Sequence, residues 1–194
     1  MGKIVLDKFV DFYHYYPKVV AMVSTAHGGR EDFMPAAWHC PISFDPPLYG
    51  VSVSPKRFTF GLIMEAKEFA IGFMPFEKAD LIAKAGGLSG KDVDKFKETG
   101  ARKDKPLKIR SPILADAYAS YECKLYSHHT CGDHEWFVGE IVAVHYDEKA
   151  FAENGVMKLE YANPALYIGS DKYMAAKAVE TRHFDRRLLG QKKA

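Results

Sequence analysis

Residues 127–136, SHHTCGDHEW, hold the densest group of side chains that could ligate a metal ion or transfer a proton. Four of them could be combined into a zinc or iron site: His128, His129, Cys131 and His134. Four ligands in so short a stretch are crowded, because a tetrahedral site usually draws its ligand pairs from separate segments. The same pattern is also typical of one catalytic histidine with polar neighbours, or of histidines that only form hydrogen bonds in a loop.

A second group of reactive side chains follows the apolar segment 48–54, which Pro55 ends. It contains two hydroxyl groups and two cations: Ser54, Lys56, Arg57 and Thr59. An arginine fork, hydroxyl donors and the amides of a helix N-terminus together suit a phosphate monoester. The alternative is an ordinary polar loop in which Thr59 caps a helix.

The glycine-rich segment 83–91, AKAGGLSGK, does not support a nucleoside triphosphate site. Asp92 occupies the position at which a P-loop needs a hydroxyl, and the segment follows a predicted helix instead of a strand. The sequence also contains no GxGxxG, so a doubly wound dinucleotide-binding domain is unsupported.

Small residues precede a tryptophan at Ala36, Ala37 and Trp38. Two alanines would let a flat ring approach the backbone, although a tryptophan is more often a core residue than a cofactor contact.

Short strands must position these residues. Apolar and β-branched runs predict strands at 18–26, 34–44, 48–54, 68–73, 118–129, 135–148 and 166–169. Helices are predicted only at 59–65 and 77–85, with a charged loop and one helical turn after them. Because no βαβ alternation appears, the pattern favours an antiparallel barrel or sandwich with one or two attached helices.

Composition limits the classes of function. A chain of 194 residues with 47% apolar residues predicts a single domain with a sizeable core. A net charge of +2 argues against partners such as nucleic acid or a membrane surface. Three cysteines without a CxxC pair, and no signal peptide or membrane-spanning run, predict a reducing cytoplasm and free thiols.

Four segments, taken in order, resemble the flavin reductase-like family of FMN-binding split barrels, which includes flavoredoxins and ferric reductases. They are FMPAAWHCPISFDPPLYGVSVSPKRFT (33–59), GGLSGKDVDKF (86–96), CGDHEWFVGEIVAV (131–144) and NPALYIG (163–169). No single segment is specific, but their order is, and the resemblance spans about residues 15–170.

The resemblance implies a mainly β fold: a six-stranded antiparallel Greek-key split β-barrel with a few short helices, binding FMN at a homodimer interface. It places Ala36, Ala37 and Trp38 along the isoalloxazine ring. The phosphate would be held by Ser54, Lys56, Arg57 and Thr59, with Lys91 reaching it from the 86–96 loop. Family members often carry Asn near Asp32, and a carboxylate there cannot donate a hydrogen bond to a flavin carbonyl.

The implied function is an oxidoreductase that passes electrons from NADH or NADPH through FMN to free flavin, ferric iron or a protein partner. His134 would act beside the ring, on the side where a nicotinamide stacks, and no metal site is expected. Two alternatives remain open, a non-enzymatic FMN electron carrier or store and a metal-binding protein that uses the 127–134 cluster. Residues from about 171 to 194 are predicted to be a C-terminal extension of the one domain, 1–194, that could pack on a second subunit.

Overall fold

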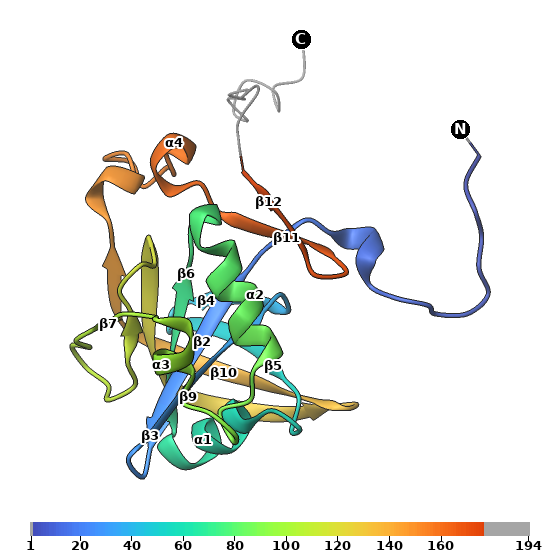
Figure 1. The fold of residues 1–194 in the computed structure, drawn as a ribbon. Helices are drawn as coiled ribbons and strands as arrows, with labels where there is room; N and C mark the ends of the chain where they lie inside the picture. Colours follow the sequence, from blue (N-terminus) through green and yellow to red (C-terminus); the bar gives the residue numbers. More distant parts are fainter. Residues whose placement is uncertain (1, 177–194) are drawn as a thin grey trace.

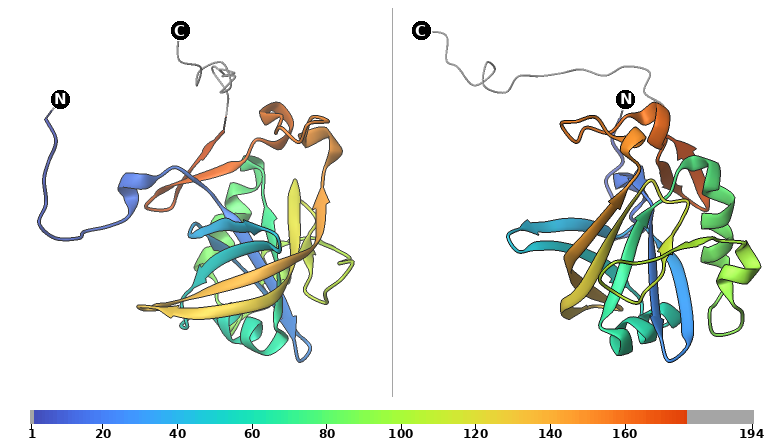
Figure 2. Two further views of the ribbon diagram at one scale, coloured as in Figure 1. Left: turned by 180° about the vertical axis from the view of Figure 1, so that it is seen from behind. Right: turned by 90° about the vertical axis from the view of Figure 1, so that its left-hand side faces the viewer.

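The protein, seen here in a computed structural model that describes residues 2–176, is built around a seven-stranded sheet in which every pairing is antiparallel (Figure 1). Its strands, in spatial order, are β3 (Arg30–Ala36), β2 (Ala21–His27), β6 (Glu68–Phe73), β9 (Ala119–Cys131), β10 (His134–Tyr146), β5 (Pro47–Val53) and β4 (His39–Phe44). Hairpins join β2 to β3, β4 to β5 and β9 to β10, and the sheet curls strongly (Figure 2).

The main sheet has one strand more than the six predicted, because the segment 34–44 does not form a single strand. The chain bends at Ala37 and Trp38, so that β3 and β4 lie at opposite edges of the strand order. The connection between the predicted strands at 18–26 and 34–44 is much shorter than their bounds imply. Only Gly28 and Gly29 form it, both at positive φ, and β3 already begins at Arg30.

Two smaller sheets complete the β structure. One has the order β1 (Lys18–Val19), β11 (Ala165–Gly169), β12 (Lys172–Ala175), and the other pairs β7 (Lys103–Asp104) with β8 (Ile113–Leu114). β12 lies at the start of the predicted C-terminal extension, and residues 177–194 of that extension lie outside the described part of the chain.

The helices are short. α1 (Phe58–Ala66) connects β5 to β6, and α2 (Ala79–Gly87) follows the 3-10 turn η2 (Phe76–Lys78), so both predicted helices are present. The remaining ones are η1 (Tyr13–Tyr15), α3 (Lys95–Thr99), η3 (Glu148–Ala150) and α4 (Leu159–Ala162). No helix among residues 2–176 has both the length and the apolar character that crossing a membrane requires.

The strands β2 and β3 have a core on each face, because successive side chains point to opposite sides. Val23 packs inside the curled sheet with Val51, Phe69 and Phe137. Met22 and Phe33 point the other way, against α2 and α3, where they meet the side chains of Leu81, Ile82 and Phe96. This second core places α2, α3 and the segment between them against β3.

Candidate functional site

The predicted phosphate loop is a turn that leads directly into α1. The Arg57 amide donates to the Ser54 carbonyl at 2.9 Å, and the Lys56 amide lies 3.4 Å from the Ser54 hydroxyl oxygen. Arg57 is the N-cap of α1, has extended backbone angles and makes no side-chain capping bond. The first amides of α1 therefore remain available to an anion.

A pocket of about 150 Å³ opens beside this loop, and we call it the basic pocket. Its walls are the start of α1, part of β3, the end of α2 with the segment that follows, and one residue of α3: Met34, Pro35, Lys56, Arg57, Phe58, Thr59, Ala85, Gly86, Leu88, Ser89, Gly90 and Lys95. This volume is smaller than that of most sites that enclose a whole cofactor-sized ligand. The basic pocket therefore suits one end of such a ligand.

Lys56 and Arg57, two of the predicted phosphate ligands, lie in the wall of the basic pocket. Lys95, which the sequence analysis did not single out, is there as well. Nothing local marks Lys95, because α3 reaches the pocket only through its packing against β3. The pocket thus gathers three cations from two distant parts of the chain.

Thr59 lies at the same pocket but is almost fully buried, with 1% of its surface exposed. Its hydroxyl donates to Asp32 Oδ2 at 2.5 Å. A hydroxyl has one proton, so in this arrangement the Thr59 side chain has none left to donate to a phosphate.

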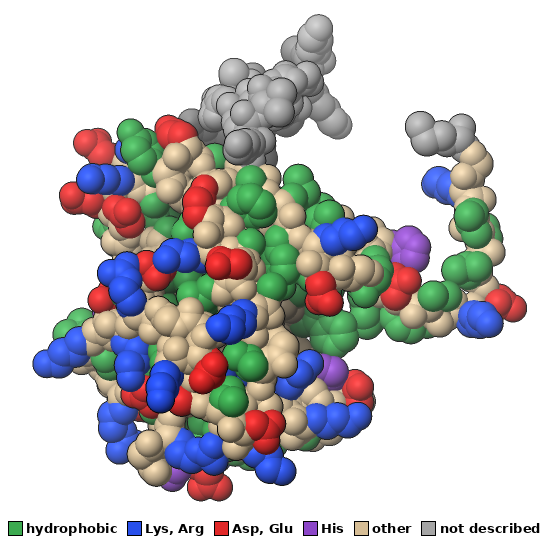
Figure 3. Space-filling view, viewed as in Figure 1, with side chains coloured by type: hydrophobic (Ala, Val, Ile, Leu, Met, Phe, Trp, Pro, Cys, Tyr) green, Lys and Arg blue, Asp and Glu red, His purple; other side chains and the backbone are tan. Residues whose placement is uncertain are grey.

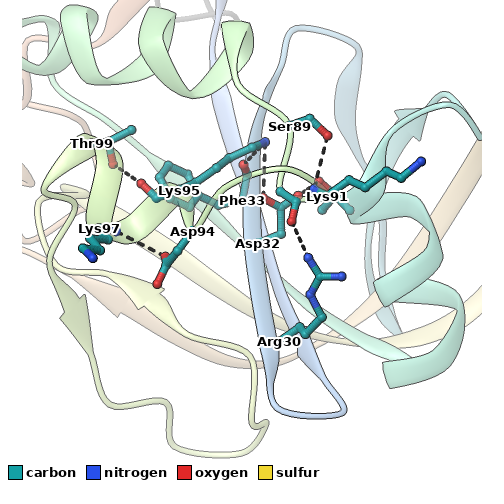
Figure 4. Close-up of polar contacts among 11 residues, drawn as sticks. Arg30, Asp32, Phe33, Ser89, Lys91, Asp94, Lys95, Lys97 and Thr99 are labelled. Carbon is teal, nitrogen blue, oxygen red and sulfur yellow. Dashed lines mark hydrogen bonds and ion pairs between the residues drawn. The ribbon is translucent and has the colours of Figure 1, made fainter.

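Asp32 lies near the position at which family members often carry Asn, and the structure places it below the surface. Its side chain is fully buried between β3, α1 and α3 and does not line the basic pocket. It accepts from Thr59, and its other oxygen lies 3.3 Å from the ammonium of Lys95 (Figure 4).

Lys91 lies outside the basic pocket. Its exposed side chain lines an adjoining, more open cavity of about 730 Å³ with Arg30, Asp92 and Asp94. The side chain points away from Asp32 and Lys95 (Figure 4). Many lysines and arginines gather in the lower half of the face shown in Figure 3, where α1, α3 and β3 lie in Figure 1.

The predicted ring contacts follow the bend between β3 and β4. Ala36 is buried and pairs with Ala21, whereas Ala37 and Trp38 are half-buried. The indole of Trp38 lies 5.0 Å from the ring of His134 and 5.0 Å from that of Phe12, measured between centroids. The structure therefore brings together Trp38 and His134, which are far apart in sequence.

His134 begins β10, and its Nδ1 lies 2.7 Å from Asp133 Oδ1. The hydrogen bond from His134 lowers the pKa of the Asp133 carboxyl, which stays ionised and favours a proton on that ring nitrogen. The indole on one side and the carboxylate on the other fix the direction in which the imidazole points.

The other histidines of the cluster have different surroundings. His128 Nδ1 lies 2.5 Å from Glu135 Oε1, and the Thr130 hydroxyl donates to Glu135 Oε2 at 2.9 Å. His129 is exposed and points to the face of β9 opposite to His128, the face on which Cys131 pairs with His134. Among residues 2–176, no three His, Cys, Asp or Glu side chains lie close enough to hold a metal ion.

Comparisons with known proteins show the family and the fold of this chain. The model of the flavin reductase like domain matches residues 12–175. An FMN-binding protein from Thermus thermophilus, solved with bound 1-cyclohex-2-enone, is 41% identical, with a TM-score of 0.83 over 94% of this chain and 99% of its own. The flavoredoxin of Desulfovibrio vulgaris is 24% identical, with a TM-score of 0.82 over 95% and 98%.

A flavin reductase with a split barrel domain from Shewanella frigidimarina is 22% identical. Its TM-score is 0.78, over 86% of both chains. The curled sheet of this protein is therefore a split barrel, which confirms the predicted fold class apart from the number of strands.

Proposed function

Because the chain belongs to the flavin reductase like domain family, we propose that it is an FMN-dependent oxidoreductase. It would take electrons from NADH or NADPH and pass them to an acceptor. The observation that carries the proposal is the basic pocket at the N-terminus of α1, with its Lys56, Arg57 and Lys95 side chains. The FMN-binding protein from Thermus thermophilus, similar over nearly the whole chain, supports the choice of flavin.

The residues present fit FMN. The uncapped amides of α1 and the cations of the basic pocket suit a phosphate dianion, and the pocket is large enough for that end of the molecule. From there the ring would run toward the bend at Ala36, Ala37 and Trp38, where two small side chains leave the backbone accessible to a flat ring.

When bound, FMN supplies the hydride and single-electron chemistry, and the protein supplies binding and orientation. Lys56 and Arg57 hold the phosphate. Trp38 and His134 border the far end, where the imidazole, oriented by Asp133, holds a proton and limits where a nicotinamide can lie. We place the nicotinamide on this side because the His134 imidazole lies 5.0 Å from the Trp38 indole, at the end toward which the flavin ring would run.

Steady-state oxidation of NADH and NADPH by the FMN-loaded protein tests the proposal, with free FMN and a ferric chelate as acceptors. We expect saturable oxidation that depends on both protein and FMN. A pure electron carrier would instead leave both nucleotides unoxidised while accepting electrons from a reduced protein partner, and this outcome would overturn the assignment.

A further inference from the structure

The N-terminal segment, residues 12–16, packs against the ring end of the site. The Phe12 ring lies edge-on to the Trp38 indole at 5.0 Å between centroids, and Trp38 Nε1 donates to the Tyr16 hydroxyl at 3.4 Å. On another side, Trp38 lies 5.0 Å from the His134 ring at an interplanar angle of 49°. Aromatic side chains from the N-terminal segment, the bend after β3 and the start of β10 therefore form one contiguous group.

The main chain at Trp38 is held from two sides. The Ser52 amide of β5 donates to the Trp38 carbonyl at 2.9 Å. The next side chain, His39, has its Nε2 2.8 Å from the Val19 carbonyl of β1 and its Nδ1 2.6 Å from the Tyr49 hydroxyl. A carbonyl can only accept, so Nε2 carries the proton and the Tyr49 hydroxyl donates to Nδ1. Burial lowers the pKa of His39 and keeps the imidazole neutral in this arrangement.

The indole itself is held by the N-terminal segment. Trp38 is half-buried, and rotation about its side-chain bonds would turn the indole without moving the backbone. The Tyr16 hydroxyl accepts from the single donor of the indole, and the Phe12 ring packs against the same indole. These two contacts favour one orientation of the indole, and that orientation fixes where the His134 ring can lie beside it.

β11 anchors the N-terminal segment. The Tyr16 ring meets the Tyr167 ring edge-on at 5.4 Å between centroids. Tyr13 packs over Gly169, where a Cβ would lie 3.0 Å from the Tyr13 ring, and Gly169 has a φ of +100°, so glycine suits both the close approach and the backbone. β1, which begins two residues after the segment, pairs with β11 (Figure 1). The small sheet formed by β1, β11 and β12 therefore supports the segment that holds Trp38.

We propose that Tyr16 and Phe12 are positioning residues for the Trp38–His134 pair, and that they orient the indole and the imidazole toward the ring that exchanges electrons with the flavin. This inference rests on the proposed function. Tyr16 and Phe12 act through Trp38, and they affect the reaction step while the basic pocket holds the phosphate of FMN. The N-terminal segment is thus part of the reactive end of the site, although it precedes every strand of the main sheet.

The test removes each contact separately. Tyr16→Phe deletes only the hydroxyl that accepts from Trp38, and Phe12→Ala deletes the ring that packs against the indole. Phe12→Tyr keeps a ring at that position. Tyr15→Phe is the matched control, because it removes the same hydroxyl group from a neighbouring, exposed tyrosine. Thermal unfolding reports the fold of each variant.

The first readout needs neither flavin nor nucleotide. The ring current of Trp38 shifts the proton resonance of His134 Cε1, which is assigned by its absence in His134→Ala. We expect Tyr16→Phe and Phe12→Ala to move this resonance toward that of an exposed histidine, because the indole then samples other orientations. Phe12→Tyr and Tyr15→Phe should leave it in place. A resonance that keeps the parental position in both Tyr16→Phe and Phe12→Ala would overturn the proposal.

The second readout is the limiting rate at which NADH or NADPH reduces the bound flavin, measured by stopped flow. We expect it to fall roughly two- to tenfold in Tyr16→Phe, the range for one lost neutral hydrogen bond, and at least as much in Phe12→Ala. Phe12→Tyr should recover the parental rate, and FMN affinity should stay parental in every variant. A purely structural role predicts that the unfolding temperature and FMN affinity fall while the limiting rate is unchanged, and this outcome would count against the proposal.

Failure of this inference and failure of the proposed function give different results. A parent protein whose bound flavin is reduced by neither nucleotide contradicts the proposed function. A parent that reduces its flavin, with the same limiting rate in Tyr16→Phe, Phe12→Ala and Tyr15→Phe, contradicts only the roles of Tyr16 and Phe12.

Discussion

Arg57 stands at the start of α1 with an exposed side chain that no carboxylate pairs with in the described part of the chain. Arg57→Ala should lower FMN affinity by about 1.5–3 kcal/mol, the range for hydrogen bonds to charged groups. The unfolding temperature should stay the same because the side chain packs against nothing in the core. Isothermal titration with FMN measures the loss, and Arg110→Ala, at another exposed arginine, is the control. Loss of cooperative unfolding in Arg57→Ala would show instead that Arg57 is structural.

His134 and His129 form a natural pair of variants, since both lie at the same end of the β9–β10 hairpin. His134→Ala removes the ring beside Trp38 and should slow reduction of bound flavin by NADH or NADPH ten- to hundredfold, about 1.4–2.8 kcal/mol. His129→Ala should change the rate little because its side chain is exposed, whereas the ring contact with Trp38 is made by His134. Stopped-flow absorbance measures both rates, and equal rates in the two variants would exclude a specific role for His134.

Residue types and their spacing predicted phosphate contacts at Lys56 and Arg57 and a role for His134, and these stay predictions. They could not identify Lys95 or the burial of Asp32, because a contact between residues 32, 59 and 95 depends on how β3, α1 and α3 pack. The same packing turned Thr59 toward Asp32. Gly90, the residue before Lys91, lies so close to Asp32 that a larger side chain would clash there. Only the structure shows this close approach.

At the scale of elements, β9 holds a neighbouring loop through one carboxylate. The fully buried Glu122 accepts from the backbone amides of Leu107, Lys108 and Ile109 at 2.6–3.0 Å, and its Oε1 lies 2.5 Å from His145 Nε2. Burial raises the pKa of Glu122, but these hydrogen bonds outweigh it and bring the pKa below its usual value of 4.5. The loop is therefore held by an ionised carboxylate.

A depressed folded pKa means that this stabilisation is present above about pH 4.5 and is lost as the pH falls through the folded pKa. Glu122→Gln should lower the free energy of unfolding by about 1–3 kcal/mol at neutral pH, because an amide cannot accept all of these donors. It should also flatten the fall in stability below pH 4.5. Urea unfolding at several pH values measures both, with the exposed Glu153→Gln as control. Parallel pH curves for the parent and Glu122→Gln would contradict this role.

The order and kind of the main elements could be predicted, since hydrophobic alternation and turn residues are local. The bend at Ala37 and Trp38 was missed because the segment 34–44 is mostly apolar and contains no glycine, while its two halves belong to different edges of the sheet. β12 was missed because it is only four residues long and depends on β11 for its pairing, whereas α3 is the helical turn predicted after the helix at 77–85.

Large apolar side chains are exposed at several places in the described part of the chain, including the β4–β5 hairpin and the N-terminal arm. Phe44 at the tip of the β4–β5 hairpin is completely exposed, and Ile4, Val5 and Phe9 are exposed on the N-terminal arm, which extends away from the sheet (Figure 1). Exposed apolar surface of this kind marks a contact with another chain. We expect a homodimer, measured as twice the chain mass by light scattering. Phe44→Ser should raise the dissociation constant of the dimer, and a parent that is monomeric with FMN fully bound would contradict this expectation.

Electron transfer from a nicotinamide nucleotide to flavin bound in this split barrel is the central claim. The most direct test mixes the FMN-loaded protein with one equivalent of NADH or NADPH in the absence of oxygen and any other acceptor, and follows the visible absorbance of the flavin. We predict that the absorbance of the oxidised flavin disappears at a rate that saturates with the nucleotide concentration, and that it returns when an acceptor is added. Flavin that stays oxidised with both nucleotides, yet is reduced by dithionite, would contradict the account.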